Sequence, residues 1–135
     1  MAHDFKKFPE LTNSQMQLYY WDSPHKQIQE SFMARVQQVT DGDTIRVKWS
    51  ERDFDFPVRM LNIDAPETNT PNARKSLNWL ADEILGEYVE VVIDMKQRVG
   101  KWGRLLGEIV HLGRNINQMS LELGYSVPFG SEELI

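Results

Sequence analysis

The sequence contains no cysteine among its 135 residues. This absence excludes a disulfide framework and any metal site built on thiolates. No apolar run approaches the roughly 20 residues that a membrane helix needs, and the first residues lack the apolar stretch of a secretory signal. We therefore expect a chain that does not enter a membrane and that stays in the cytoplasm, unless a leader has been removed.

The sequence also has fewer basic than acidic residues. Lys and Arg number 15 against 20 Asp and Glu, which gives a formal net charge of −5. Proteins that hold nucleic acid tightly and without sequence preference usually present a basic surface. The charge therefore argues against a tight, processive nucleic-acid binder. It leaves room for an enzyme that gathers carboxylates around a metal ion and binds one phosphate locally.

The length suits one domain, and the hydrophobic pattern changes its period along the chain. The first 30 residues are polar with scattered aromatic side chains, and Thr12 or Ser14 is placed to cap a short helix through Tyr20. From residue 32 onward, strand-like alternation prevails until a helical period takes over near residue 77. Strands are predicted over residues 32–39, 44–49, 54–63, 88–94 and 104–111, and helices over residues 77–85 and 116–123.

This order of elements is typical of the OB fold, a small and partly open barrel with a helix between its third and fourth strands. We expect an α+β, mainly β chain with a five-stranded OB-fold barrel and two helices. Residues 1–30 would form an N-terminal extension, residues 31–130 the barrel domain, and residues 131–135 a short tail.

Acidic side chains occur at predicted turns next to strand ends. Asp43 follows the first strand, whereas Asp64 and Glu67 follow the third. Such loops can converge on one rim of a barrel, and a hard divalent cation binds several carboxylate and carbonyl oxygens. Asp64 and Ala65 can offer one carboxylate and one carbonyl, and Pro66 fixes the backbone so that Glu67 points outward. Taken singly, each segment also fits an ordinary polar turn.

Two arginines extend this set. Arg59 lies in a strand that is apolar on both faces, so its guanidinium loses hydration and needs a fixed anionic partner. That partner is either a structural carboxylate or a phosphate. Arg104, at the start of the last strand, is by itself an ordinary surface residue. Together with metal-type carboxylates and a free glutamate, two arginines supply what phosphodiester hydrolysis requires.

These residues fall in three segments: Asp41-Gly42-Asp43-Thr44, then Arg59 followed by Asp64-Ala65-Pro66-Glu67, then Lys101-Trp102-Gly103-Arg104. In this order and with this spacing, the segments resemble the signature of the staphylococcal (micrococcal) nuclease family. The resemblance covers roughly residues 32–128, and the three-part pattern is more specific than any single motif. Asn117 and Gly124 in the following helix also resemble family positions.

The resemblance implies a calcium-dependent nuclease that hydrolyses phosphodiester bonds of DNA or RNA. Asp43, Asp64 and the backbone carbonyl of Ala65 would bind one Ca²⁺ ion, and Asp41 would support this site from behind. The family often has threonine where Ala65 stands. Because the ligand is a carbonyl, this change should be tolerated.

The resemblance also implies catalytic roles. Arg59 and Arg104 would clamp the scissile phosphate, and Glu67 would deprotonate or orient the attacking water. Family products carry a 3′-phosphate, so the P–O5′ bond is expected to break. Lys101 and Trp102 would lie near the nucleotide.

The base side of the expected site departs from the family pattern. A tyrosine of the type member stacks on the base, and only Phe129 is available here as a substrate contact. The C-terminal helix that completes the family core has no counterpart before Ile135. We therefore expect the aromatic N-terminal segment to cover the barrel surface that this helix would otherwise cover.

The expected partner is a single-stranded or breathing nucleic acid, bound weakly by a monomer. An alternative within the same fold is a nucleic-acid-binding module with weak or no catalysis. Such modules typically lose the arginines and acids that are all present here. Another alternative is a docking protein whose aromatic N-terminus fastens it to an assembly, and a tethered nuclease would combine both roles. Fold alone does not choose between them, because OB barrels host many functions.

Overall fold

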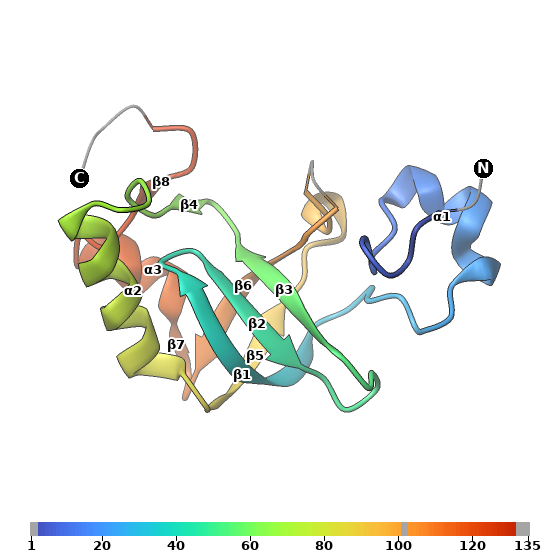
Figure 1. The fold of residues 1–135 in the computed structure, drawn as a ribbon, viewed down its shortest axis with the longest axis horizontal. Helices are drawn as coiled ribbons and strands as arrows, with labels where there is room; N and C mark the ends of the chain where they lie inside the picture. Colours follow the sequence, from blue (N-terminus) through green and yellow to red (C-terminus); the bar gives the residue numbers. More distant parts are fainter. Residues whose placement is uncertain (1–2, 101–102, 132–135) are drawn as a thin grey trace.

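The computed structural model describes residues 3–100 and 103–131, and its centre is a closed barrel (Figure 1). The barrel strands are antiparallel in the order β3-β2-β1-β5-β6, and a parallel pairing of β3 with β6 closes the sheet. The predicted five-stranded OB-fold barrel is confirmed. Its strands are β1 (Phe32–Asp41), β2 (Thr44–Lys48), β3 (Asp55–Met60), β5 (Tyr88–Val92) and β6 (Leu105–His111).

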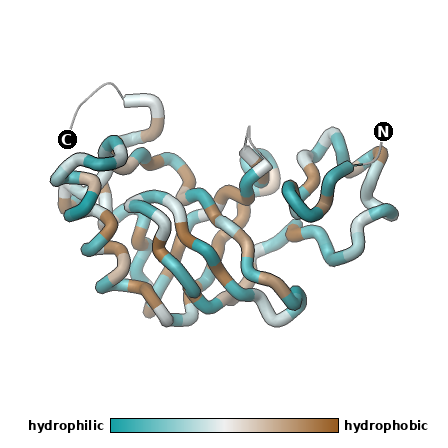
Figure 2. The backbone as a smooth tube through the Cα atoms, viewed as in Figure 1, coloured by the Kyte–Doolittle hydropathy of each residue, from teal (hydrophilic) through white to brown (hydrophobic). Residues whose placement is uncertain are grey.

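Alternation along each strand builds the core. In β1, Phe32, Ala34 and Val36 are buried, whereas Met33 and Arg35 between them are exposed. Successive strand side chains point to opposite faces, so one apolar set fills the barrel while the other set meets solvent or a covering element. Figure 2 shows hydrophobic residues recurring between hydrophilic ones along these strands. Further interior residues are Ile45, Val47, Phe56, Val58, Met60, Val89, Val91, Leu105 and Ile109.

The third strand ends earlier than the predicted residues 54–63. It stops at Met60 because Asn62 adopts a left-handed backbone, with φ of 66°. The chain then enters β4 (Ile63–Asp64), which pairs with β8 (Val127–Pro128) in a separate two-stranded sheet. A further short strand, β7 (Arg114–Asn115), extends the barrel sheet beside β6. These two-residue pairings had no periodic signal in the sequence.

Both predicted helices are present and lie at one end of the barrel (Figure 1). Thr70 caps α2 (Pro71–Ile84), whose first residue is a proline, and the helix ends before Gly86 at φ of 80°. Asn115 caps α3 (Ile116–Glu122). In the described part of the chain, no helix is long and apolar enough to cross a membrane.

The N-terminal segment, residues 3–30, lies at the opposite side from α2 (Figure 1). Thr12, and not Ser14, caps α1 (Asn13–Tyr19) through a reciprocal capping box with Gln15, and the 3-10 turn η1 (Tyr20–Asp22) follows. Leu11 and Ile28 are fully buried, and Ile28 belongs to the barrel core cluster. A second 3-10 turn, η2 (Met95–Gln97), separates β5 from β6. The division of the chain at residue 30 remains a prediction.

Candidate active site

Arg59 is the best-connected side chain among the predicted site residues. Its position in β3 alternates with the buried Val58 and Met60, so the guanidinium leaves the barrel interior, yet only 13 % of the side chain is exposed. It donates hydrogen bonds to the carbonyls of Met60 (2.9 Å) and Ile63 (2.7 Å). Asp64 lies 2.6 Å away and Asp43 3.2 Å away. The anionic partners of Arg59 are thus the two carboxylates that the resemblance assigns to a metal.

Asp43 lies in the turn between β1 and β2, and hydrogen bonds hold both of its oxygens. Thr44 donates its hydroxyl to Oδ1 (3.0 Å), and the N–H of Ala65 donates to Oδ2 (2.8 Å). The N–H of Asp43 itself donates to Asp41 (3.1 Å). These contacts join the first and second signature segments, which are 22 residues apart in the sequence.

Gly42 allows helix α2 to approach this turn. A Cβ atom at this position would lie 2.0 Å from the Ser76 hydroxyl and 3.0 Å from the Ala65 methyl group. The glycine is therefore required by close packing, and its backbone is not in the left-handed region. Sequence reasoning saw a polar turn here and missed this steric role.

Asp64 is fixed by the C-terminal part of the chain. It lies in β4, where it pairs with Val127, and its Oδ2 accepts a hydrogen bond from the N–H of Gly130 (3.1 Å). The same pairing brings Phe129 to the site, with its ring centroid 6.0 Å from the Arg59 guanidinium carbon. The Phe129 side chain nevertheless remains 71 % exposed. The two-residue sheet thus explains how residues near 129 reach Arg59.

The acidic pair beside Arg59 is electrostatically crowded. Burial, together with the hydrogen bond and negative charge of Asp43, raises the pKa of Asp41 to about 6. Burial also acts to raise the pKa of Asp43, but hydrogen bonds from Asp41 and Ala65 and the charge of Arg59 outweigh it and lower that pKa. The site therefore holds more negative charge than Arg59 alone relieves.

This donor set fits a hard cation. Asp43 and Asp64 offer carboxylate oxygens, Ala65 adds a backbone carbonyl, and oxygen ligands of this kind suit Ca²⁺. Within the described residues, no group of three or more His, Cys, Asp or Glu side chains stands ready to hold a metal. A bound ion would therefore need further ligands besides these side chains, such as substrate oxygens and water.

Glu67 lies beyond Asp64 in the turn that leads to α2. Its side chain is exposed, and its backbone carbonyl accepts the Thr70 hydroxyl (2.8 Å), which fixes the turn. The predicted contacts Lys101 and Trp102 lie outside the described residues.

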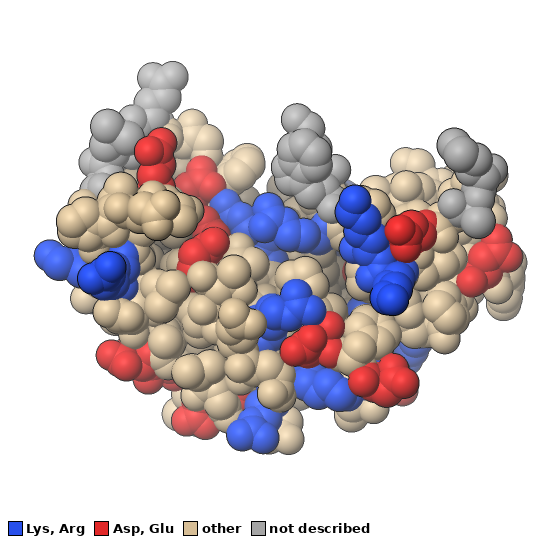
Figure 3. Space-filling model, in the orientation of Figure 1, with Lys and Arg blue, Asp and Glu red and all other residues tan. Residues whose placement is uncertain are grey.

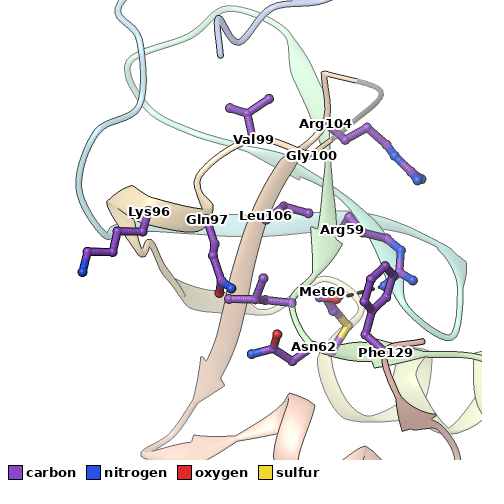
Figure 4. Close-up of a pocket in the computed structure, with 11 residues that line it drawn as sticks. Arg59, Met60, Asn62, Lys96, Gln97, Val99, Gly100, Arg104, Leu106 and Phe129 are labelled. Carbon is purple, nitrogen blue, oxygen red and sulfur yellow. Dashed lines mark hydrogen bonds between the residues drawn. The ribbon is translucent and has the colours of Figure 1, made fainter. Parts of the chain in front are cut away.

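A cleft of about 490 Å³ opens beside Arg59. Arg59, Arg104 and Phe129 extend to the same side of it, whereas Lys96 and Gln97 lie on its other side (Figure 4). The structure therefore brings both predicted arginines to one cavity. Sequence reasoning missed Asn62, Lys96 and Gln97, although an asparagine within the predicted strand over residues 54–63 was a signal for a turn there. The remaining lining residues are Met60, Leu61, Val99, Gly100 and Leu106.

Asn117, which also resembles a family position, is a buried structural link. Its amide donates to the carbonyls of Leu61 (2.9 Å) and Gly107 (3.3 Å), and its Oδ1 accepts the N–H of Ile109 (3.0 Å). It thus ties α3 to β6 and to the bend that follows Arg59.

Residues 57–132 match the family model described as staphylococcal nuclease homologue. Two curated relatives, from Escherichia coli O157:H7 and Escherichia coli, are each named an uncharacterized endonuclease. Each is 35% identical over 91 residues, which is 67% of this chain and 56% of the relative. A Bacillus anthracis protein described as uncharacterized is 27% identical over 104 residues, 73% of this chain and 48% of its own length. The chain thus spans about half the length of the curated relatives that it matches.

Proposed function

Because the chain belongs to the staphylococcal nuclease homologue family, we propose that it hydrolyses the phosphodiester bonds of DNA or RNA. One observation carries the proposal. Arg59, held between Asp43 and Asp64, faces a cleft of about 490 Å³ that Arg104 also lines. Two guanidinium groups at one cavity suit the bidentate recognition of a phosphate.

The arginines bind and stabilise charge. Arg59 is fixed by its carboxylate partners and by two backbone carbonyls, so little reorganisation is needed when a phosphate reaches it. Arg104 approaches the same cavity from the start of β6. Negative charge that develops on the equatorial phosphate oxygens would thus meet one cation that is already held in place and a second cation, Arg104, at the same cavity.

One Ca²⁺ ion fits the oxygen donors of Asp43, Asp64 and the Ala65 carbonyl, with Asp41 hydrogen-bonded to Asp43 behind them. When bound, the ion would polarise the phosphoryl oxygen as a Lewis acid. Asp43 and Asp64 orient the site through their bonds with Thr44, Ala65 and Gly130.

Glu67 is the proposed general base or water-orienting group. In the reaction, a water oxygen forms a bond with phosphorus, its proton passes to Glu67, and the P–O5′ bond breaks. The departing 5′-oxygen takes a proton from solvent, and the phosphate stays on the 3′ side. Glu67 is an exposed carboxylate on a fixed turn and does not itself line the cleft, so its role rests on its place in the Asp64-Ala65-Pro66-Glu67 motif.

The substrate is proposed to be a single-stranded or breathing nucleic acid. Phe129, exposed beside Arg59, offers an aromatic face on which an unstacked base can rest. A net charge of −5 keeps affinity modest and sensitive to salt. The proposed active unit is a monomer.

A gel assay tests this proposal directly. Single- and double-stranded DNA and RNA are incubated with the full chain in calcium and in chelator. We expect cleavage in calcium, faster on single strands, with 3′-phosphate ends detectable by phosphatase treatment. No cleavage of any of the four substrates in calcium would overturn the proposal.

A binding or docking module on the same barrel is the second candidate. The observation in its favour is that Trp21 is 93 % exposed and Leu18 74 % exposed in the N-terminal segment, as in surfaces that meet a partner. Retention of nucleic acid without cleavage in the same assay would support it.

A further inference from the structure

We propose that the start of the N-terminal segment, residues 3–8, is part of the substrate-binding surface, with Lys6 and Lys7 contacting phosphates of a single strand that leaves the cleft past Arg104. This inference rests on the proposed function. It assigns the segment a role in binding the polymer beyond the scissile phosphate. Nothing in the three signature segments points to it.

The segment is fastened to the barrel by a buried charge cluster. The Glu10 carboxylate lies between Arg98 (2.9 Å) and Arg52, and none of the three residues is more than 3% exposed. Arg98 also donates to the carbonyls of Ile28 (2.7 Å) and Leu11. A buried ion cluster of this kind requires fixed geometry, because each charge depends on its partners for solvation. The lysines that precede Glu10 are therefore carried by an anchored segment.

The segment meets the turn that carries Arg104. A Cβ atom on Gly103 would lie 2.9 Å from Cδ1 of the Phe8 ring, and Gly103 has φ of 76°. Both the backbone and the contact thus require glycine here. Pro9 and Glu10 of the segment line, together with Gly103 and Arg104, a cavity of only about 10 Å³. The N-terminal segment and Arg104 therefore form one continuous surface.

Lys6 and Lys7 lie next to this junction. Asp4 accepts hydrogen bonds from both of their backbone N–H groups (3.2 and 3.1 Å), which fixes the turn. The Lys7 ammonium lies 5.4 Å from the centre of the Phe8 ring, the same ring that covers Gly103. Among the residues that the structure describes, neither lysine side chain pairs with a carboxylate. Two exposed cations without a carboxylate partner among the described residues thus lie on the segment whose Phe8 ring packs against Gly103, the residue before Arg104.

The charge distribution favours a phosphate backbone as the occupant. Much of the surface of a chain with net charge −5 repels a polyanion. Figure 3 shows Lys and Arg gathered in the upper middle of the displayed face, between the end that carries α2 and the N-terminal segment. The alternative exit runs past Arg74 and Lys75 on α2, where the groove also contains Asp41. The route over Lys6 and Lys7 avoids Asp41, and the Asp4 carboxylate on that route is engaged by the backbone N–H groups of the two lysines.

Equilibrium binding of labelled oligonucleotides tests the inference. Fluorescence anisotropy is measured with a single-stranded 12-mer and, by competition, with a dinucleotide, over a series of salt concentrations. All proteins carry Glu67→Gln to suppress cleavage. The test variant is Lys6→Gln/Lys7→Gln, and the matched control is Arg74→Gln/Lys75→Gln, which removes the same charge from α2.

We expect the Lys6→Gln/Lys7→Gln variant to bind the 12-mer on the order of tenfold more weakly and to lower the salt slope of log Kd by about 1.4, because two phosphate contacts are lost. Dinucleotide binding and the unfolding midpoint should not change, and the control should keep parental values. Unchanged 12-mer binding, equal loss for the dinucleotide, or loss only in the control would overturn the inference. If the chain with Glu67 intact cleaves nucleic acid and the lysine variant binds the 12-mer normally, only this inference fails. If the chain with Glu67 intact neither binds nor cleaves nucleic acid, the proposed function fails with it.

Discussion

The guanidinium of Arg59 lies 2.6 Å from the carboxylate of Asp64. The same Nη2 atom lies 3.2 Å from Asp43, so a single cation joins a carboxylate from the β1–β2 turn and a carboxylate from β4. A phosphate bound at this place would share Arg59 with both acids. Arg59 therefore has a structural role and a proposed catalytic role, whereas Arg104 lines the same cleft and forms no ion pair with another described residue. The two arginines can be separated by experiment.

Replacing Arg59 by Gln should lower both activity and stability, whereas Arg104→Gln should lower activity alone. One charge-stabilising contact in such a site contributes about 3–4 kcal/mol to barrier lowering, or two to three decades in rate. Without Arg59, two partly buried carboxylates lose their partner, at a cost of about 1–3 kcal/mol in unfolding free energy. Arg46→Gln is the control, since Arg46 pairs with Asp55 on the barrel exterior. Near-parental rates in both variants would show that the site is wrong.

Replacing Glu67 by Gln should reduce kcat by roughly two to four decades, the contribution of a positioned acid or base. The side chain is exposed, so the unfolding midpoint should stay within the range of ordinary surface substitutions. Thermal unfolding and cleavage rates are measured on the same preparations. Unaltered kcat would remove Glu67 from the mechanism, and a large loss of stability would make the kinetic result uninterpretable as a catalytic effect.

Calcium should raise the unfolding midpoint as well as support cleavage. A ligand that binds only the folded chain stabilises it by about 2.7 kcal/mol at 100 times its Kd. The shift should disappear in Asp43→Asn and in Asp64→Asn, because these carboxylates are the proposed ligands. Asp55→Asn, which removes an exterior carboxylate, should keep the shift. Equal cleavage in chelator and in calcium would contradict a metal-dependent reaction.

The barrel was predictable because the alternation of apolar and polar residues within each strand is visible in short stretches of the sequence. Ile45 and Val47 alternate with polar neighbours, and burial of one strand face follows from that period. The end of α2 was also predictable, since Gly86 follows the last apolar residue, but the helix begins at Pro71 and not at the predicted residue 77, because Thr70 caps a first turn that has no apolar period. The proposed catalytic residues could be picked out only because three spaced motifs together resemble a family.

The features that the sequence did not predict depend on contacts between residues that are far apart in the chain. The β4–β8 pairing joins Asp64 to Val127, and two residues are too few to show a period. The buried cluster of Glu10 with Arg52 and Arg98 spans sequence separations of 42 and 88 residues. From the sequence alone, each of these charged side chains is expected to be exposed to solvent. Whether a charge is buried depends on its partner in the folded structure and not on the residues next to it in the sequence.

Gly42→Ala should destabilise the fold by about 1–3 kcal/mol, the usual cost of overpacking. The new methyl group would meet the Ser76 side chain at 2.0 Å, so α2 or the Asp41–Asp43 turn must shift. Ser76→Gly removes both the hydroxyl and the Cβ that cause the clash. The double variant should therefore recover part of the loss, which a double-mutant cycle of unfolding free energies measures. Strict additivity of the two changes would show that these residues do not meet.

The N-terminal segment is expected to stabilise the barrel. Deleting residues 1–28 exposes the surface that Leu11 and Ile28 help to bury, and burial of such a side chain contributes about 1.5–3 kcal/mol. Deletion also leaves Arg52 and Arg98 without the Glu10 carboxylate.

Glu10→Gln isolates the loss of this carboxylate and should lower the free energy of unfolding by about 3–5 kcal/mol, because two buried guanidiniums remain without an anion. Glu30→Gln, an exposed glutamate at the end of the same segment, is the control. Chemical unfolding provides the free energies, and the deletion should lower the midpoint at least as much as Glu10→Gln does. A deletion variant with an unchanged midpoint and full activity would reject the packing role and would favour a docking arm, whose exposed Trp21 would then be the residue to test first.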